Sequence, residues 1–174
     1  MTIVRPARAT DTAAIARIHI DMWRIAYADT LDAAFLRRLS YRRSQAQWDA
    51  IIARHSGVLA VADSTEDGIV GFASGGAERT RAFAVDGELM ALYVLTSAQG
   101  CGVGRQLLRS VASQLRDNGR TGMLTWVLAD NDARGFYARL GAKPALTAPI
   151  QLGDTAVERV AYVWDGWEVL LGSR

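Results

Sequence analysis

The chain has 174 residues, of which 50% are hydrophobic and 22% are charged, with a formal net charge of +2 at pH 7. These values predict one globular domain spanning 1–174, with a sizeable core. No apolar run approaches the roughly 18 residues that a membrane span needs, and basic residues are scattered, so neither a membrane nor a nucleic acid is expected as a partner. The single cysteine, Cys101, excludes an internal disulfide framework. With no apolar signal region at the N-terminus, a cytoplasmic location is the default expectation.

The first part of the chain predicts one strand followed by a long helix. The sequence IVRPA at 3–7 predicts a short strand that Pro6 stops. Thr10 or Asp11 can cap the helix that follows. Its apolar residues recur at helical spacing, at Ile15, Ile18, Met22 and Ile25.

Two further helices are expected before the pattern changes. A short helix is predicted after Asp32, and its apolar residues are Phe35, Leu36 and Leu39. The next helix is predicted to contain Trp48, Ile51 and Ile52 and to end near Gly57, a natural C-terminal cap.

From residue 57 onward, short apolar runs of strand length replace the helical spacing. Residues 57–63 and 69–78, joined by the turn residues STEDG, predict an antiparallel hairpin, and residues 87–95 predict a third strand.

The last third of the chain predicts alternating helices and strands. After the third strand comes a helix whose apolar face is formed by Leu107, Leu108, Val111, Ala112 and Leu115. The remaining predicted elements are a strand at 122–129, a helix at 131–141 that Gly141 closes, and two strands near 145–152 and 157–164. This order predicts a mixed α/β (α+β) domain around one sheet.

Gly100, Gly102 and Gly104 occupy alternate positions between the predicted third strand and the helix after it. A Walker-type loop is excluded because Gly104 is followed by Arg105 and Gln106, and the spacing fits a Rossmann fingerprint poorly. Backbone N–H groups at a helix N-terminus can instead bind a pyrophosphate, and glycines allow its close approach. The alternative is a tight strand-to-helix turn without a ligand.

The surrounding sequence resembles the GNAT superfamily of acetyl-CoA-dependent N-acyltransferases. QGCGVG at 99–104 resembles that family's phosphate loop, and ELMALYV before it resembles the family's fourth strand. NDARGFYARLGAKP, beginning at Asn131, resembles the family's downstream Asn and Phe-Tyr segment, and the opening residues resemble its first strand and helix. The resemblance implies a GNAT-like fold, with about seven strands in a splayed central sheet and helices on its faces.

The resemblance also implies a binding site for acetyl-CoA where the fourth and fifth strands part. Strand-like hydrogen bonds to the pantetheine arm would come from the main chain of Leu92, Tyr93 and Val94. The pyrophosphate would lie on the loop, near Arg105. The loop residues concerned are Gln99, Gly100, Cys101, Gly102, Val103 and Gly104. In this position Cys101 is a bystander.

Two residues of the downstream segment are expected to contact the coenzyme. Asn131 matches the asparagine that contacts the pantetheine arm, although helix capping is an equal alternative. Phe136 packs against either the coenzyme or the core.

Two residues are candidates for the acid–base chemistry of acyl transfer. Tyr137 matches the family tyrosine that acts as general acid beside the sulfur, and the alternative is a half-buried structural aromatic. Glu88 lies where several family members carry a glutamate base, and the alternative is an ordinary exposed strand-end carboxylate. Main-chain N–H groups near Tyr93 or Val94 could stabilise the oxyanion.

The pocket for the amine is the least specified part of the site. The aromatic candidates are Trp23, Tyr27, Phe83, Tyr93 and Trp164. His19 is expected to be structural, while Asp29 and Glu78 could attract a cationic amine. No acidic spacing indicates a metal site.

The sequence therefore predicts an N-acetyltransferase that moves acetyl from acetyl-CoA to a primary amine of a small molecule or peptide, by direct attack in a ternary complex. The alternative is a CoA-binding regulatory module without turnover. A homodimer is also expected, paired through the last strands and the apolar segment 157–164.

Overall fold

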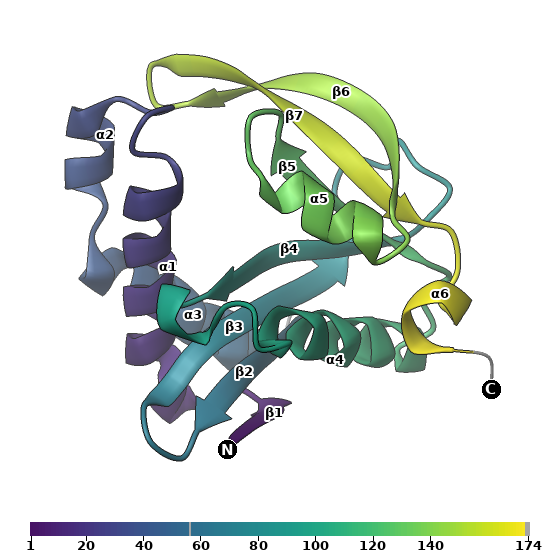
Figure 1. Cartoon of the computed structure of the whole chain (residues 1–174), viewed down its shortest axis with the longest axis horizontal. Helices are drawn as coiled ribbons and strands as arrows, with labels where there is room; N and C mark the ends of the chain where they lie inside the picture. The colour runs from purple at the N-terminus through teal and green to yellow at the C-terminus, as the bar shows by residue number, and fades with distance from the viewer. Residues whose placement is uncertain (56, 173–174) are drawn as a thin grey trace.

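The computed structural model describes residues 1–55 and 57–172 as a mixed sheet with helices on both faces (Figure 1). Within these residues the sheet has seven strands in the order β1-β2-β3-β4-β5-β7-β6. Their bounds are β1 (Thr2–Pro6), β2 (Val58–Ser64), β3 (Gly68–Ala77), β4 (Gly87–Val94), β5 (Met123–Leu128), β6 (Lys143–Leu152) and β7 (Thr155–Trp164). Only β4 and β5 pair in parallel; the other described pairings are antiparallel. The predicted fold class and the predicted order of elements are confirmed.

The helices divide between the two faces of the sheet. Their bounds are α1 (Thr12–Ala26), α2 (Ala33–Arg38), α3 (Tyr41–Arg54), α4 (Val103–Asp117), α5 (Ala133–Arg139) and α6 (Glu168–Leu171), with short 3-10 turns at Ala9–Asp11 and Thr96–Ala98. In one core cluster, α1 and α3 pack on alternate residues of β2 that include Leu59 and Val61. In the other, α4 packs on Ala60 and Ala62, because side chains alternate between the two faces of a strand. No helix in the described ranges is both long enough and apolar enough to cross a membrane.

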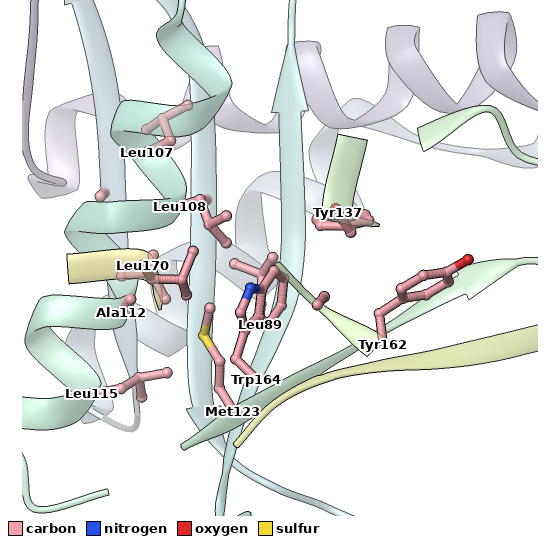
Figure 2. Packing of buried hydrophobic residues seen from close by; sticks show 14 of the residues in the cluster. Leu89, Leu107, Leu108, Ala112, Leu115, Met123, Tyr137, Tyr162, Trp164 and Leu170 are labelled. Atoms are coloured by element: carbon pink, nitrogen blue, oxygen red, sulfur yellow. The ribbon is translucent and has the colours of Figure 1, made fainter. Parts of the chain in front are cut away.

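The apolar face predicted for α4 forms the centre of the larger core. Leu107, Leu108 and Val111 are fully buried. Figure 2 shows the leucines of this helix directed toward Leu89 of β4 and toward Met123 and Trp164 of β5 and β7. The packing therefore joins α4 to both halves of the sheet.

Two local predictions are wrong, and one short helix was not predicted. The helix expected to end near Gly57 ends at Arg54, and His55 adopts the left-handed conformation (φ 46°) expected of a glycine. Ile25, assigned to the apolar face of the first helix, is 62% exposed, because it lies beyond the last turn that packs on the sheet. The short helix α6 was not predicted.

The position of the last strands also differs from the sequence expectation. Residues 157–164 were expected to form an exposed edge, but β7 lies between β5 and β6, and β6 is the edge strand. Pro144 and Pro149 lie in β6. Proline is tolerated at sheet edges and discourages further strand pairing.

The predicted splay between β4 and β5 is present. The two strands pair only from Gly87 to Leu89 on β4, opposite 123–125 on β5. At the closed end, glycines allow the backbones to approach, since a Cβ on Gly87 would lie 2.6 Å from the carbonyl oxygen of Gly122. Beyond Leu89, β4 carries a bulge at Met90, opposite a register shift in β3. A bulge bends its strand, so the rest of β4 leaves β5.

Candidate active site

The open edge of β4 presents main-chain groups without a neighbouring strand. The N–H of Leu95 donates to the carbonyl oxygen of Val70 on β3 at 2.8 Å. Because antiparallel bonding alternates along a strand, the main chain of Tyr93 faces β3, whereas that of Leu92 and Val94 faces the open side. Gln99 donates from Nε2 to the carbonyl oxygen of Val94 at 2.9 Å, and so the loop is tied to this edge.

The glycine loop leads directly from this edge into α4. Gly100 and Gly102 have φ values of 76° and 82°, and a Cβ on either would meet nothing within 4 Å. Gly102 is the N-cap of α4, and no side chain caps this helix start. The first N–H groups of a helix have no partner inside the helix, so here they are available to an anion. Cys101 in this loop is exposed.

The start of α4 packs on α5, which carries the downstream candidates. A Cβ on Gly104 would lie 3.5 Å from the ring of Phe136, so glycine permits a close approach of the helix to that ring. Asn131 accepts a hydrogen bond from the N–H of Ala133 at 2.8 Å through Oδ1, so the capping interaction expected for it is present. Arg105 lines a cavity of about 220 Å³ beside α5, together with Arg109 and Arg139.

Three tyrosines from separate elements lie close together where the sheet splays. Burial raises the pKa of Tyr137 on α5, and the neighbouring Tyr27 hydroxyl raises it further, while a hydrogen bond with Thr125 partly offsets both effects. Burial likewise raises the pKa of Tyr93 on β4. It also raises the pKa of Tyr27 at the end of α1, where Asn131 and Tyr93 lower it in part. All three hydroxyls therefore stay protonated at neutral pH and can donate hydrogen bonds.

Three of the five aromatic candidates for the amine pocket lie together, and the other two lie elsewhere. Trp23 donates from Nε1 to the hydroxyl of Tyr93 at 2.8 Å and contacts Tyr27 edge to face, so these three lie together. Phe83 instead packs against Trp126 of β5. Trp164 belongs to the core on the α4 face, where its Nε1 donates to the carbonyl oxygen of Leu140.

Glu88 is buried rather than exposed. Its side chain is 1% exposed, and the guanidinium of Arg79 engages both of its oxygens, with Nε 3.0 Å from one of them. The Arg79 main-chain N–H donates to the same carboxylate. The expectation of an ordinary exposed strand-end carboxylate is therefore wrong. Sequence reasoning missed Arg79, whose only signal was its position in the connection that leads to β4.

Of the two remaining charged candidates, one has a local structural role and the other is exposed. Glu78 accepts hydrogen bonds from main-chain N–H groups of Thr80 and Arg81, so it caps the turn after β3. Asp29 is exposed. Across the residues for which the structure gives positions, no group of three or more His, Cys, Asp or Glu side chains could hold a metal ion.

The comparisons with known proteins identify the family of this fold and site. A family model for the acetyltransferase (GNAT) domain matches residues 54–141. The uncharacterized N-acetyltransferase YuaI of Bacillus subtilis (strain 168) is 30% identical over 164 residues, which cover 94% of this chain and 93% of that protein. The chain therefore belongs to the GNAT acetyltransferase family. The predicted family and enzyme class are confirmed, and acetyl-CoA is the acyl donor that this family implies.

Solved structures of low sequence identity share the fold. The ribosomal-protein-alanine N-acetyltransferase of Brucella melitensis superposes with a TM-score of 0.73 at 23% identity, covering 94% of this chain and 99% of that one. YncA of Salmonella typhimurium, solved with its cofactor acetyl-CoA, gives a TM-score of 0.69 at 21% identity, covering 94% of this chain and 93% of that one.

His19 packs behind the tyrosines, as the structural histidine that the sequence predicts. Its ring contacts Trp23, Trp48 and Tyr93, and Nδ1 lies 3.3 Å from the hydroxyl of Ser44. Burial lowers the pKa of His19 from 6.5 to about 4. The folded protein therefore keeps this imidazole neutral under conditions in which the unfolded chain protonates it.

This shift predicts a loss of stability in weak acid. Between pH 6.5 and about 4 the unfolded chain binds a proton at His19 that the folded chain does not. The free energy of unfolding should fall with pH there, with a slope from this group approaching about 1.4 kcal/mol per pH unit. In urea unfolding between pH 4.5 and 6.5, His19→Gln should show a shallower slope than the wild type. Equal slopes in the two proteins would contradict the assignment.

Proposed function

We propose that this protein transfers acetyl from acetyl-CoA to a primary amine by direct attack in a ternary complex. The observation that carries the proposal is the adjacency of two sets of main-chain groups, the edge of β4 that has no neighbouring strand and the uncapped start of α4. The first fits an extended chain that bears amides, as pantetheine does, and the second fits a pyrophosphate. The whole of 1–174 is proposed to act as one acyltransferase domain.

In this arrangement the pantetheine arm adds to the sheet beside β4. The hydrogen bonds come from the main chain of Leu92 and Val94, which faces the open side, while Tyr93 contributes its side chain on the α1 face. Asn131, at the start of α5, contacts the arm from the opposite wall, and Phe136 packs beneath it. The pyrophosphate lies on residues 99–104, with Arg105 supplying a nearby positive charge.

The chemistry requires a neutral amine, a stabilised oxyanion and a protonated leaving group. The amine nitrogen attacks the thioester carbon, and the N–H of Val94 or its neighbour donates to the oxyanion. When the C–S bond breaks, the sulfur takes the bonding electron pair and receives a proton from the Tyr137 hydroxyl. The amine releases its own proton through a bridging water to Glu88, which passes it on to solvent. Tyr137 is reprotonated from solvent, so that amide and free thiol are the products.

Glu88 is proposed to act as base through a water molecule. Because Arg79 engages both carboxylate oxygens, the amine cannot readily share either of them directly. A bridging water can accept a proton from the amine and remain hydrogen-bonded to the carboxylate.

The competing function is a CoA-binding regulatory module without turnover. Binding of acetyl-CoA with no thiol release on any amine would favour it.

A homodimer and a cytoplasmic location also belong to the proposal. Since β7 lies between β5 and β6, residues 157–164 cannot continue the sheet across a dimer, and a dimer would use another surface.

Gly102 and Gly119 provide a matched test of the phosphate loop. Both have positive φ, 82° and 81°, and both offer open space to a Cβ, but Gly119 follows the far end of α4. Ala at either position should cost about 1 kcal/mol of stability through backbone strain. Only Gly102→Ala should also weaken acetyl-CoA binding, at least tenfold by calorimetry, because its Cβ obstructs the pyrophosphate. Equal affinities for the two variants would remove the loop from the site.

Tyr137→Phe tests the general acid. Removing the hydroxyl should lower kcat about 100-fold or more, since proton transfer in the transition state contributes about 100- to 10,000-fold, and should leave the Kd for acetyl-CoA within twofold. Thiol release gives the first quantity and calorimetry the second. Tyr41→Phe, a change at an exposed tyrosine at the start of α3, serves as the control. Unchanged turnover in Tyr137→Phe would exclude this residue as the acid.

A further inference from the structure

Besides Glu88 and Tyr93, one face of the splayed sheet carries charged and aromatic side chains that the proposed chemistry does not use. Residues directly opposite each other in a sheet share a face, and alternate residues of one strand do too. Glu88 lies opposite Leu124, and Arg159 of β7 lies opposite Leu128, so Glu88, Trp126 and Arg159 share one face. Tyr93 lies on the same face, because it is opposite Phe72, which packs with α1.

The proposed function places the acceptor on this face, because the amine-pocket candidates Trp23, Tyr27 and Tyr93 lie together there. This face borders α1 and α2 and, across the splay, the β6–β7 hairpin. At the hairpin tip, a Cβ on Gly153 would lie 2.6 Å from the ring of Phe35 on α2, so the tip reaches that helix (Figure 1). Glu88 and Arg159 therefore lie on the face of the sheet that α1, α2 and the hairpin border.

The charges on this face do not balance. Arg79 pairs with Glu88, but the guanidinium of Arg159 makes no hydrogen bond to any described residue. It lies over the ring of Trp126, with Cζ 4.0 Å from the ring centroid. Burial and the charge of Arg79 lower the pKa of Arg159, and Glu88 offsets only part of this. Among the described residues, Glu88 forms an ion pair with Arg79, and no carboxylate forms one with Arg159.

The unsatisfied polar atoms of this face are both donors. The Nε of Arg159 and the Nε1 of Trp126 are buried and have no hydrogen-bond partner among the described residues. Leaving a buried donor unpaired is costly, and a guanidinium is shaped to bind a carboxylate through two parallel N–H groups. No described residue accepts a hydrogen bond from either atom, which is the arrangement expected where a ligand supplies the acceptor.

We propose that the amine substrate also carries a carboxylate, as an amino acid does, and that Arg159 binds it. This inference rests on the proposed function and names its substrate class. Pairing the carboxylate with Arg159 restores charge balance and places the substrate on the α1 face. An amine without an anionic group would instead bring a third positive charge to this face before it loses its proton.

Matched substrates test the inference. With acetyl-CoA and the twenty amino acids, each compared with its own carboxamide, the best amino acid should exceed its amide in kcat/KM by about 30-fold or more. Arg159→Gln should remove most of that preference, and Arg159→Lys should restore part of it. Arg17→Gln, which removes the same charge from an exposed position on α1, should keep the wild-type preference. Amides that react as well as acids, or an unchanged preference in Arg159→Gln, would overturn the inference.

Stability and anion binding give a second readout that does not need turnover. If Arg159 only stabilises the fold, Arg159→Gln should lower the melting temperature. If Arg159 is instead an anion-binding residue that is unpaired without ligand, the melting temperature of the ligand-free variant should equal or exceed that of the wild type. In this experiment sulfate is compared with chloride at equal ionic strength, and saturating CoA is present to occupy the loop. Sulfate should then raise the melting temperature of the wild type more than that of Arg159→Gln. Equal rises, with no amino acid acetylated, would overturn the inference.

Different results would contradict the proposed acetyltransferase function and the proposed role of Arg159. Absence of acetyl-CoA binding in calorimetry would defeat the proposed function, while the difference in sulfate response between wild type and Arg159→Gln would still decide whether Arg159 binds an anion.

Discussion

The short parallel pairing between β4 and β5 is the constraint on which the site depends. Three residue pairs join these strands, and the bulge at Met90 then turns β4 away. Everything proposed to contact acetyl-CoA borders the gap that results: the free edge of β4, the loop that follows it and the start of α5. A continuous sheet would use the same main-chain groups for its own ladder and leave none for a ligand.

The gap between β4 and β5 must be compensated elsewhere, because strands that diverge lose hydrogen bonds and side-chain contacts with each other. The support comes from α4, whose buried face contacts residues of both halves of the sheet, including Leu89 and Met123 (Figure 2). At the closed end, Gly87 and Gly122 let the backbones of neighbouring strands approach closely. The helix thus joins the two halves, and its own N-terminus points back to the gap. The apolar face of α4 thus stabilises the fold, and the uncapped N-terminus of the same helix is proposed to bind the ligand.

Much of this could be predicted from local sequence patterns. The spacing of Leu107, Leu108 and Val111 shows the helical face directly, and the alternating glycines mark the loop, because both signals lie within one element. The environment of Glu88 could not be predicted, since its burial depends on Arg79 in the preceding connection and on β5 beside it. The grouping of Tyr27, Tyr93 and Tyr137 likewise requires three elements that only the folded chain brings together. The same is true of β7, whose place inside the sheet cannot be recognised from its own residues.

The most direct test of the open edge is amide hydrogen exchange at single residues, measured by NMR with and without acetyl-CoA. The N–H groups of Leu92 and Val94 face the gap, whereas that of Tyr93 faces β3. If the coenzyme adds to β4 as a strand, binding should slow exchange at Leu92 and Val94 and change Tyr93 much less. Saturating acetyl-CoA with unchanged exchange at both residues would contradict the proposal that this edge is the coenzyme site.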